Sequence, residues 1–188
     1  VRFGVNAGNS ITSGGNYNVV VGDEAGTAIT TGDNNVAVGY SALVANTTGA
    51  SNSAFGLNSL YTNTTGGSNV AVGQDALFAN TTASNNTAVG KSALAANTTG
   101  SFNTGLGDSA LLANTTGNTN TAVGGRALQT NTTGDRNTAV GFQSLALLNP
   151  SSNADMYNTG IGYNAGYAVT TGTNNTLIGG LAGDAITT

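Results

Sequence analysis

Eight carboxylates, with no histidine and no cysteine beside them, decide which chemistry this sequence can do. The commonest general base, the thiol nucleophile and most zinc or copper ligands are missing. The acids lack the G-G-x-G-x-D spacing of calcium-binding repeats, and no aromatic cleft accompanies the one adjacent pair, so an acid/base pair is disfavoured. We expect no enzyme, metal site or cofactor, and interpret the carboxylates as solvated turn residues that oppose sideways aggregation: Asp23, Glu24, Asp33, Asp75, Asp108, Asp135, Asp155 and Asp184.

Charge and hydropathy exclude two further classes. Only four basic residues and a net charge of -4 argue against a surface that follows phosphates, so nucleic acid is not an expected partner. No run approaches the roughly 20 apolar residues of a membrane-spanning helix, so we expect no membrane insertion. Because residue 1 is Val, we expect a processed product or part of a longer chain.

Six Asn-Thr-Thr triplets match the N-glycosylation pattern, as do Asn85 and Asn174. Sugars on these triplets would coat one edge of the molecule. Against this, terminal units carry Ile or Val at the same position, which indicates an inward side chain. Both interpretations stay open for these residues: Asn46, Asn63, Asn80, Asn97, Asn114 and Asn131.

A 17-residue repeat must position all of these residues. The unit reads N-T-A-V-G-x-x-A-L-x-A-N-T-T-G-x-x, and partial units at both ends bring the number to eleven. The whole of 1–188 is therefore expected to be one repeat domain, with an irregular loop at 147–157. Each repeat has a glycine at the same position, where we expect a corner of the coil: Gly22, Gly39, Gly56, Gly73, Gly90, Gly107, Gly124, Gly141, Gly162 and Gly179.

A unit of this length is too short for helical repeats of about 33 to 47 residues and for leucine-rich repeats of about 20 to 29. It fits an all-β fold, a parallel β-solenoid (β-roll) of eleven coils about 50 Å long, with strands about 4.8 Å apart. Asn-Thr-Ala-Val reads as a strand with Thr and Val on one face and Ala on the other. Glycine then supplies a corner with permissive backbone angles.

An asparagine lies four residues before each corner glycine. Identical residues stacked at the coil spacing can link their amides into a ladder, which we favour over the alternative that Asn simply suits a turn. The expected structural ladder is Asn18, Asn35, Asn52, Asn69, Asn86, Asn103, Asn120, Asn137, Asn158 and Asn175.

Central and terminal units differ in a correlated way. Where Leu follows Ala, as at Leu111, Asn comes three residues later; where Gly follows Ala, as at Gly26, Ile or Val does. We expect both positions to point into one thin core, so that Leu111 and Ile29 fill equivalent space.

Threonine rows raise ice binding, or binding to another flat surface, as an alternative function. The row at Thr87, Thr104, Thr121 and Thr138 is interrupted by Val36, Ser53 and Val70, which predicts a position that faces the core. In each Thr-Thr pair only one side chain is expected to be exposed.

The interruption at 147–157 contains the only Pro of the chain and its only Met. Since Pro cannot donate to a strand ladder, we expect an outward loop. Loops on regular scaffolds often carry function, so this one is the candidate contact site, although a neutral insertion is an equal alternative. Its residues are Asn149, Pro150, Asp155, Met156 and Tyr157.

Asn-Thr-Ala-Val-Gly followed by Ala resembles the head repeats of trimeric autotransporter adhesins and related repeats of tail-fibre-like proteins. The resemblance implies a left-handed parallel β-roll, three chains packed side by side, and a location outside the cell, at the cell surface or on a virion. Here each unit is three residues longer than the family's, and no stalk, anchor or chaperone domain is visible.

Together these features predict a stiff, non-enzymatic rod that takes part in adhesion or forms a structural fibre. The expected partners are copies of itself, as a homotrimer or an end-to-end fibre, and a surface glycan or receptor. A thin core that buries few large side chains per coil gives a separate reason to expect assembly, because chain entropy opposes an isolated rod.

Overall fold

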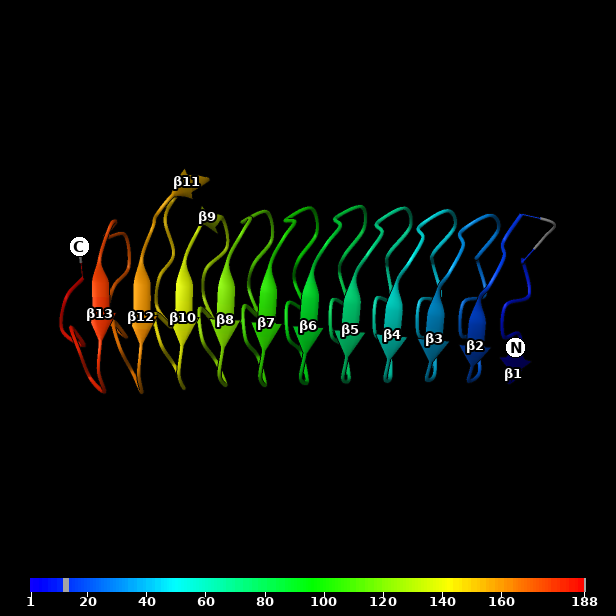
Figure 1. The fold of residues 1–188 in the computed structure, drawn as a ribbon, viewed down its shortest axis with the longest axis horizontal. Coiled ribbons are helices and arrows are strands. Elements are labelled where there is room, and N and C mark those ends of the chain that lie inside the picture. Colours follow the sequence, from blue (N-terminus) through cyan, green and yellow to red (C-terminus); the bar gives the residue numbers. More distant parts are fainter. Residues whose placement is uncertain (12–13, 188) are drawn as a thin grey trace.

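Eleven short strands stack side by side into a rod (Figure 1). The computed structural model describes residues 1–11 and 14–187, and those residues contain no helix. The two ends of the chain lie at opposite ends of the rod. The main sheet contains, in spatial order, β1 (Arg2–Phe3), β2 (Val19–Val21), β3 (Val36–Val38), β4 (Ser53–Phe55), β5 (Val70–Val72), β6 (Thr87–Val89), β7 (Thr104–Leu106), β8 (Thr121–Val123), β10 (Thr138–Val140), β12 (Thr159–Ile161) and β13 (Thr176–Ile178).

Every neighbouring pair in this sheet is parallel and in register. Val70 pairs with Thr87, and Val72 with Val89, so equivalent residues of successive repeats lie side by side. One repeat therefore makes one coil, and the structure confirms the predicted parallel β-solenoid. A second sheet of two parallel strands, β9 (Gly134–Asp135) and β11 (Ala154–Asp155), lies at the edge of the coils where the long repeat is accommodated (Figure 1).

The corner glycines let the coils stack closely. All ten predicted positions have φ between +122° and +135°, a region that side chains with a Cβ rarely adopt. A Cβ on Gly90 would lie 2.5 Å from the carbonyl oxygen of Gly107 in the next coil. Glycine is thus required here both by the backbone angle and by the contact.

The segment after each corner also uses left-handed backbone. Ser92 and Leu94 have φ of 56° and 53°. The Ser92 N–H donates to Gln74 in the preceding coil at 2.9 Å, and the Leu94 N–H donates to Ala110 in the following coil at 2.9 Å. Each left-handed residue costs about 1–2 kcal/mol, and in return the turn segment is bonded to both neighbouring coils.

The core is one side chain wide. From β2 to β12 the central residue of each strand of the main sheet, usually Ala as at Ala88, points inward and is buried. The leucine of the opposite wall, such as Leu94, fills the remaining space and is also fully buried. A thin core built from Ala and one larger residue per coil is what the sequence predicts.

The two coil types are confirmed as alternative ways to fill this core. Leu111 and Ile29 are both fully buried. A Cβ on Gly26 would lie 2.6 Å from Val20 Cγ1 and 2.8 Å from Ile29 Cδ1, so a leucine cannot enter a coil that already holds these two side chains. The correlation seen in the sequence therefore has a direct steric cause.

Candidate functional site

The outer face of the main sheet is a flat surface with two rows of side chains. From β2 to β12 the first and third residues of each strand in this sheet point away from the core and the central residue is buried, whereas in β13 the central Leu177 is partly buried. Here, these two rows are named the first row and the third row. The first row is Val19, Val36, Ser53, Val70, Thr87, Thr104, Thr121, Thr138, Thr159 and Thr176, and the third row is Phe3, Val21, Val38, Phe55, Val72, Val89, Leu106, Val123, Val140, Ile161 and Ile178.

The third row is apolar from one end of the rod to the other. Val72, Val89 and Ile161 are each 37% exposed, and Phe55 is 41% exposed. Eleven strands spaced about 4.8 Å apart give the row a length of about 48 Å. A monomeric protein rarely leaves so long a continuous apolar stripe in water.

The first row corrects the prediction that its threonines face the core. Thr87 and Thr121 are half-buried on the outer face, and it is Ala88 and Ala122 between the flanking residues that are fully buried. Ala faces inward because the leucine of the opposite wall already occupies the interior. A β-branched residue at every inward position would overfill the coil.

Aromatic and aliphatic side chains border the third row at two places. Tyr40 and Leu57, one residue after the corner glycine, are 57% and 42% exposed near the N-terminal half. Phe142 and Tyr163 occupy the same position near the C-terminal half, and their rings stack with centroids 5.9 Å apart. These residues widen the apolar stripe.

The predicted asparagine ladder, here called the strand asparagine row, joins coil to coil mainly through the backbone. Asn86 Oδ1 accepts the backbone N–H of Asn103 at 2.9 Å, and Asn86 Nδ2 donates to the carbonyl of Gly100 at 2.9 Å. Some members add an amide-to-amide bond, as Asn137 does to Asn120 at 3.0 Å. From Asn35 to Asn158 the side chains of this row are buried.

The Asn-Thr-Thr asparagines, here called the turn asparagine row, form a continuous amide chain. Asn97 Nδ2 donates to Asn80 Oδ1 at 3.0 Å, and Asn114 Nδ2 donates to Asn97 Oδ1 at 2.8 Å. The second hydrogen of Asn97 Nδ2 goes to Gly100 O at 2.9 Å. The sequence assigned the amide ladder chiefly to the strand row, but it is most regular in the turn row.

Burial of the turn row bears on glycosylation. All six side chains, Asn46, Asn63, Asn80, Asn97, Asn114 and Asn131, are fully buried, and from Asn63 onward each Nδ2 donates two hydrogen bonds. These amides are out of reach of a glycosyltransferase once the coils have closed. Asn85 and Asn174, outside this row, are exposed.

The candidate contact loop is more integrated than expected. Pro150 and Met156 are buried, whereas Asn149, Asp155 and Tyr157 are exposed. The expectation of a wholly outward loop is wrong at the first two residues, because strand β11 pairs with β9 and folds the segment back onto the rod.

Glycine makes room for these two buried residues. A Cβ on Gly134 would lie 3.1 Å from both Met156 Cγ and Pro150 Cγ. The insertion is therefore packed against the preceding coil and holds only three of its five candidate residues in contact with solvent.

Three exposed side chains, Arg136, Asp155 and Tyr157, bond the insertion to the preceding coil on its outer side. Arg136 forms an ion pair with Asp155 at 2.9 Å and donates to the Tyr157 hydroxyl at 2.6 Å. Its guanidinium carbon lies 5.6 Å from the centre of the Tyr157 ring. The hydrogen bond to Tyr157, followed by the charge of Asp155, raises the pKa of Arg136 above its ordinary value.

The other carboxylates lie at coil edges. Asp33 and Asp135 each accept a backbone N–H of the preceding coil at 2.6 Å, from Asn16 and Asn118. Within residues 1–11 and 14–187 no three acidic side chains converge as metal ligands. The same residues include no helix that could cross a membrane.

No protein-family model, curated protein or solved structure matches this chain. The resemblance to adhesin-head and tail-fibre repeats therefore depends on its sequence motif alone.

Proposed function

We propose that this protein is a non-enzymatic segment of an extracellular fibre that packs side by side with copies of itself through the outer face of the main sheet. The observation that supports it is the unbroken apolar third row, flanked by Val, Ser or Thr in the first row. Burial of apolar surface is the dominant favourable term in most protein association.

Another copy of the same chain is the partner that fits this face best. Its coils have the same rise, so two stripes stay in step along the whole rod, whereas a surface with another period would lose contact after a few coils. A stripe about 48 Å long and about 10 Å wide offers about 500 Å². Because a stable interface buries about 800 Å² per partner, the bordering aromatic and aliphatic residues would also have to be covered.

Three chains per fibre, a left-handed coil and a location at the cell or virion surface are carried over from the resemblance to adhesin heads. Trimeric packing would give each stripe two neighbours. The mechanical role follows from the bonding: strand pairs and the strand asparagine row connect coil to coil, and the turn asparagine row adds a second connection from Asn46 to Asn131. Such a rod is a stiff spacer whose repeated surface can make many weak contacts at once.

The oligomeric state of the intact chain tests this proposal. We expect sedimentation equilibrium to give a trimer, and Val72→Glu/Val89→Glu to give a monomer with an unchanged circular dichroism spectrum, since two charges per chain would be buried in the interface. Thr65→Glu/Thr82→Glu is the matched control, because both threonines are exposed away from the sheet. A wild-type chain that stays monomeric up to its solubility limit would contradict the proposal.

A second candidate, binding to ice or another flat surface, gains from one observation. Six consecutive threonines of the first row, Thr87 to Thr176, lie on the outer face in register. We expect no thermal hysteresis from the assembled wild type, because this face is covered. Appreciable hysteresis from a monomeric wild type, abolished by Thr121→Glu, would favour this candidate instead.

A further inference from the structure

Two aromatic side chains stack on the turn side of the rod, and the next repeats have no ring at this position. Tyr61 and Phe78 occupy the same position in successive repeats, and their rings stack with centroids 5.0 Å apart and planes 8° apart. The next repeat has Ala95 at this position, and the one after it has Leu112. The missing ring leaves a shallow hollow of about 470 Å³ next to Phe78.

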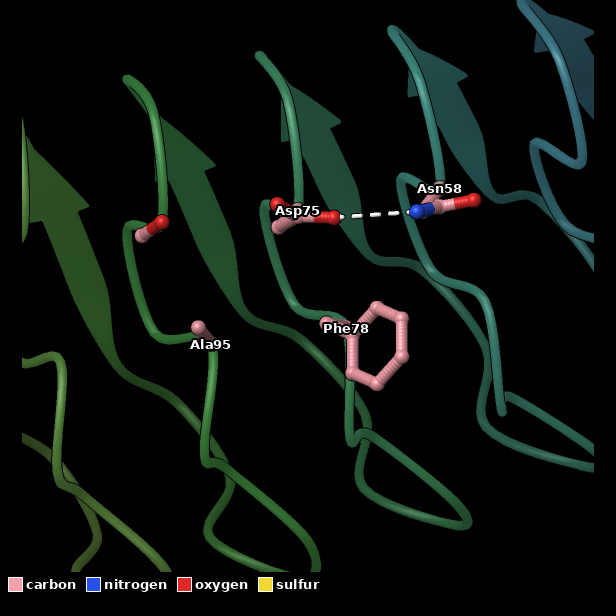
Figure 2. A pocket seen from close by; sticks show the side chains of 5 residues that line it. Asn58, Asp75, Phe78 and Ala95 are labelled. Atoms are coloured by element: carbon pink, nitrogen blue, oxygen red, sulfur yellow. Dashed lines mark hydrogen bonds between the residues drawn. The ribbon is translucent and has the colours of Figure 1, made fainter.

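The hollow has one apolar side and one polar side. Phe78 and Ala95 supply the apolar part, while Asn58, Asp75 and Ser92 form a polar rim. Figure 2 shows the Phe78 ring broadside, with the Asn58–Asp75 pair along one edge and Ala95 on the neighbouring coil. The rim residues share one position of the repeat, so the coil spacing sets their separation.

The polar rim keeps unused bonding capacity. Asn58 Nδ2 donates to Asp75 Oδ1 at 3.2 Å, and Gln74 Nε2 donates to Asp75 Oδ2 at 3.0 Å. A carboxylate accepts about four hydrogen bonds, so both oxygens of Asp75 can still accept. Within the described ranges the Ser92 hydroxyl has no partner.

We propose that this hollow binds the pyranose ring of a neutral saccharide. A pyranose has an apolar face of C–H groups, which suits the negative face of an aromatic ring, and an edge of hydroxyls. Those hydroxyls donate to Asp75 and exchange hydrogen bonds with Asn58 and Ser92. The Asp75 carboxylate and the net charge of -4 disfavour uronic and other acidic sugars.

This site is distinct from the assembly face, since it lies on the turn segment and not on the main sheet. A hollow this shallow predicts weak binding, with a Kd of about 1 mM. If chains assemble side by side, copies of the hollow on one fibre would add their affinities for a polysaccharide through effective concentration. The site itself does not depend on that assembly.

Titration of the full ¹⁵N-labelled chain with neutral methyl glycosides and with glucuronate tests the proposal. We expect saturable shifts at Ser92 and Ala95 with at least one neutral glycoside, and at least tenfold weaker binding of glucuronate. Ala95→Phe would extend the ring stack into the hollow and abolish binding, and Phe78→Ala would weaken it at least tenfold.

Both variants are expected to fold, because Phe and Ala already occupy this position in neighbouring coils. Gln129→Ala, at the same position but away from the hollow, is the control and should bind as the wild type does. Absence of saturable shifts with every neutral glycoside would overturn the proposal. So would saturable binding that Ala95→Phe leaves unchanged, or a preference for the acidic sugar.

Discussion

Removing two adjacent members of the turn asparagine row should cost much less than the sum of the two single removals. The variants are Asn80→Ala, Asn97→Ala and the double variant, in the middle of the amide chain. Both side chains are fully buried, and Asn97 Nδ2 donates a hydrogen bond to Asn80 Oδ1 at 3.0 Å.

The magnitude follows from counting buried groups left without a partner. Asn97→Ala orphans Asn80 Oδ1 and one N–H of Asn114, while Gly100 O keeps its bond from the strand row. Asn80→Ala likewise orphans Asn63 Oδ1 and one N–H of Asn97. At about 2 kcal/mol per group, each single variant loses about 4 kcal/mol. The double variant still orphans only two groups, so it also loses about 4 kcal/mol in place of about 8.

Equilibrium urea unfolding followed by far-UV circular dichroism measures these differences, with a constant m value as the check on comparable transitions. Thr99→Ala, exposed in the same coil, is the control and should shift stability by less than about 0.5 kcal/mol. If each asparagine only fastened its own turn, the two losses would add within about 0.5 kcal/mol. Additivity of that kind would refute the ladder as a cooperative element.

Two further predictions concern the close stacking of coils. Gly90→Ala should lower the free energy of unfolding by more than about 3 kcal/mol, because φ is +134° and the new Cβ would meet the backbone of the next coil. Gly180→Ala is the control: a Cβ there has nothing within 4 Å, so the variant should be nearly neutral in the same urea titration. Equal effects of the two variants would contradict the steric account. Gly26→Leu should lower the free energy of unfolding by about 1–3 kcal/mol, because the core of that coil becomes overpacked. The triple variant Val20→Ala/Gly26→Leu/Ile29→Asn should recover most of that loss, as measured by calorimetry. A triple variant less stable than the single one would show that the two coil types are not interchangeable.

The repeat was enough to predict the architecture. Spacing of 17 residues, too short for helical units, placed one strand and its corners in each coil, and the register of β5 with β6 is what that spacing requires. The exchange of Leu111-type for Ile29-type residues also predicted which positions share the core, because two side chains that replace each other must occupy one volume.

The orientation of the strand could not be predicted in the same way. Alternation shows that Thr87 and Val89 share one face and Ala88 lies on the other, but it does not say which face is inside. Hydropathy alone favours the larger residue inside. The outcome depends on Leu94, which reaches across from the opposite wall and leaves room only for Ala; that distance is a property of the closed coil.

The packing of the insertion could not be predicted from the sequence for a related reason. Pro150 lacks the N–H that a strand needs, which correctly predicted a break in the ladder. It did not reveal that Gly134, sixteen residues earlier in the chain, leaves a depression that Pro150 and Met156 fill. Nothing in the local sequence signals this contact between neighbouring coils.

The amide rows also give the rod an electrical direction. From Asn18 to Asn158 in the strand row and from Asn46 to Asn114 in the turn row, each Oδ1 accepts a hydrogen bond from the coil that follows, as at Asn97 and Asn86. Backbone bonds of one coil run both ways, as for Ser92 and Leu94, and largely cancel. In the turn row each Nδ2 from Asn63 onward also donates back to the preceding coil. Aligned amides polarise one another, so the dipoles of this row add along the axis, with the positive end toward the N-terminal end of the rod. In a pulsed electric field this axial dipole would favour alignment of the rod's long axis with the field.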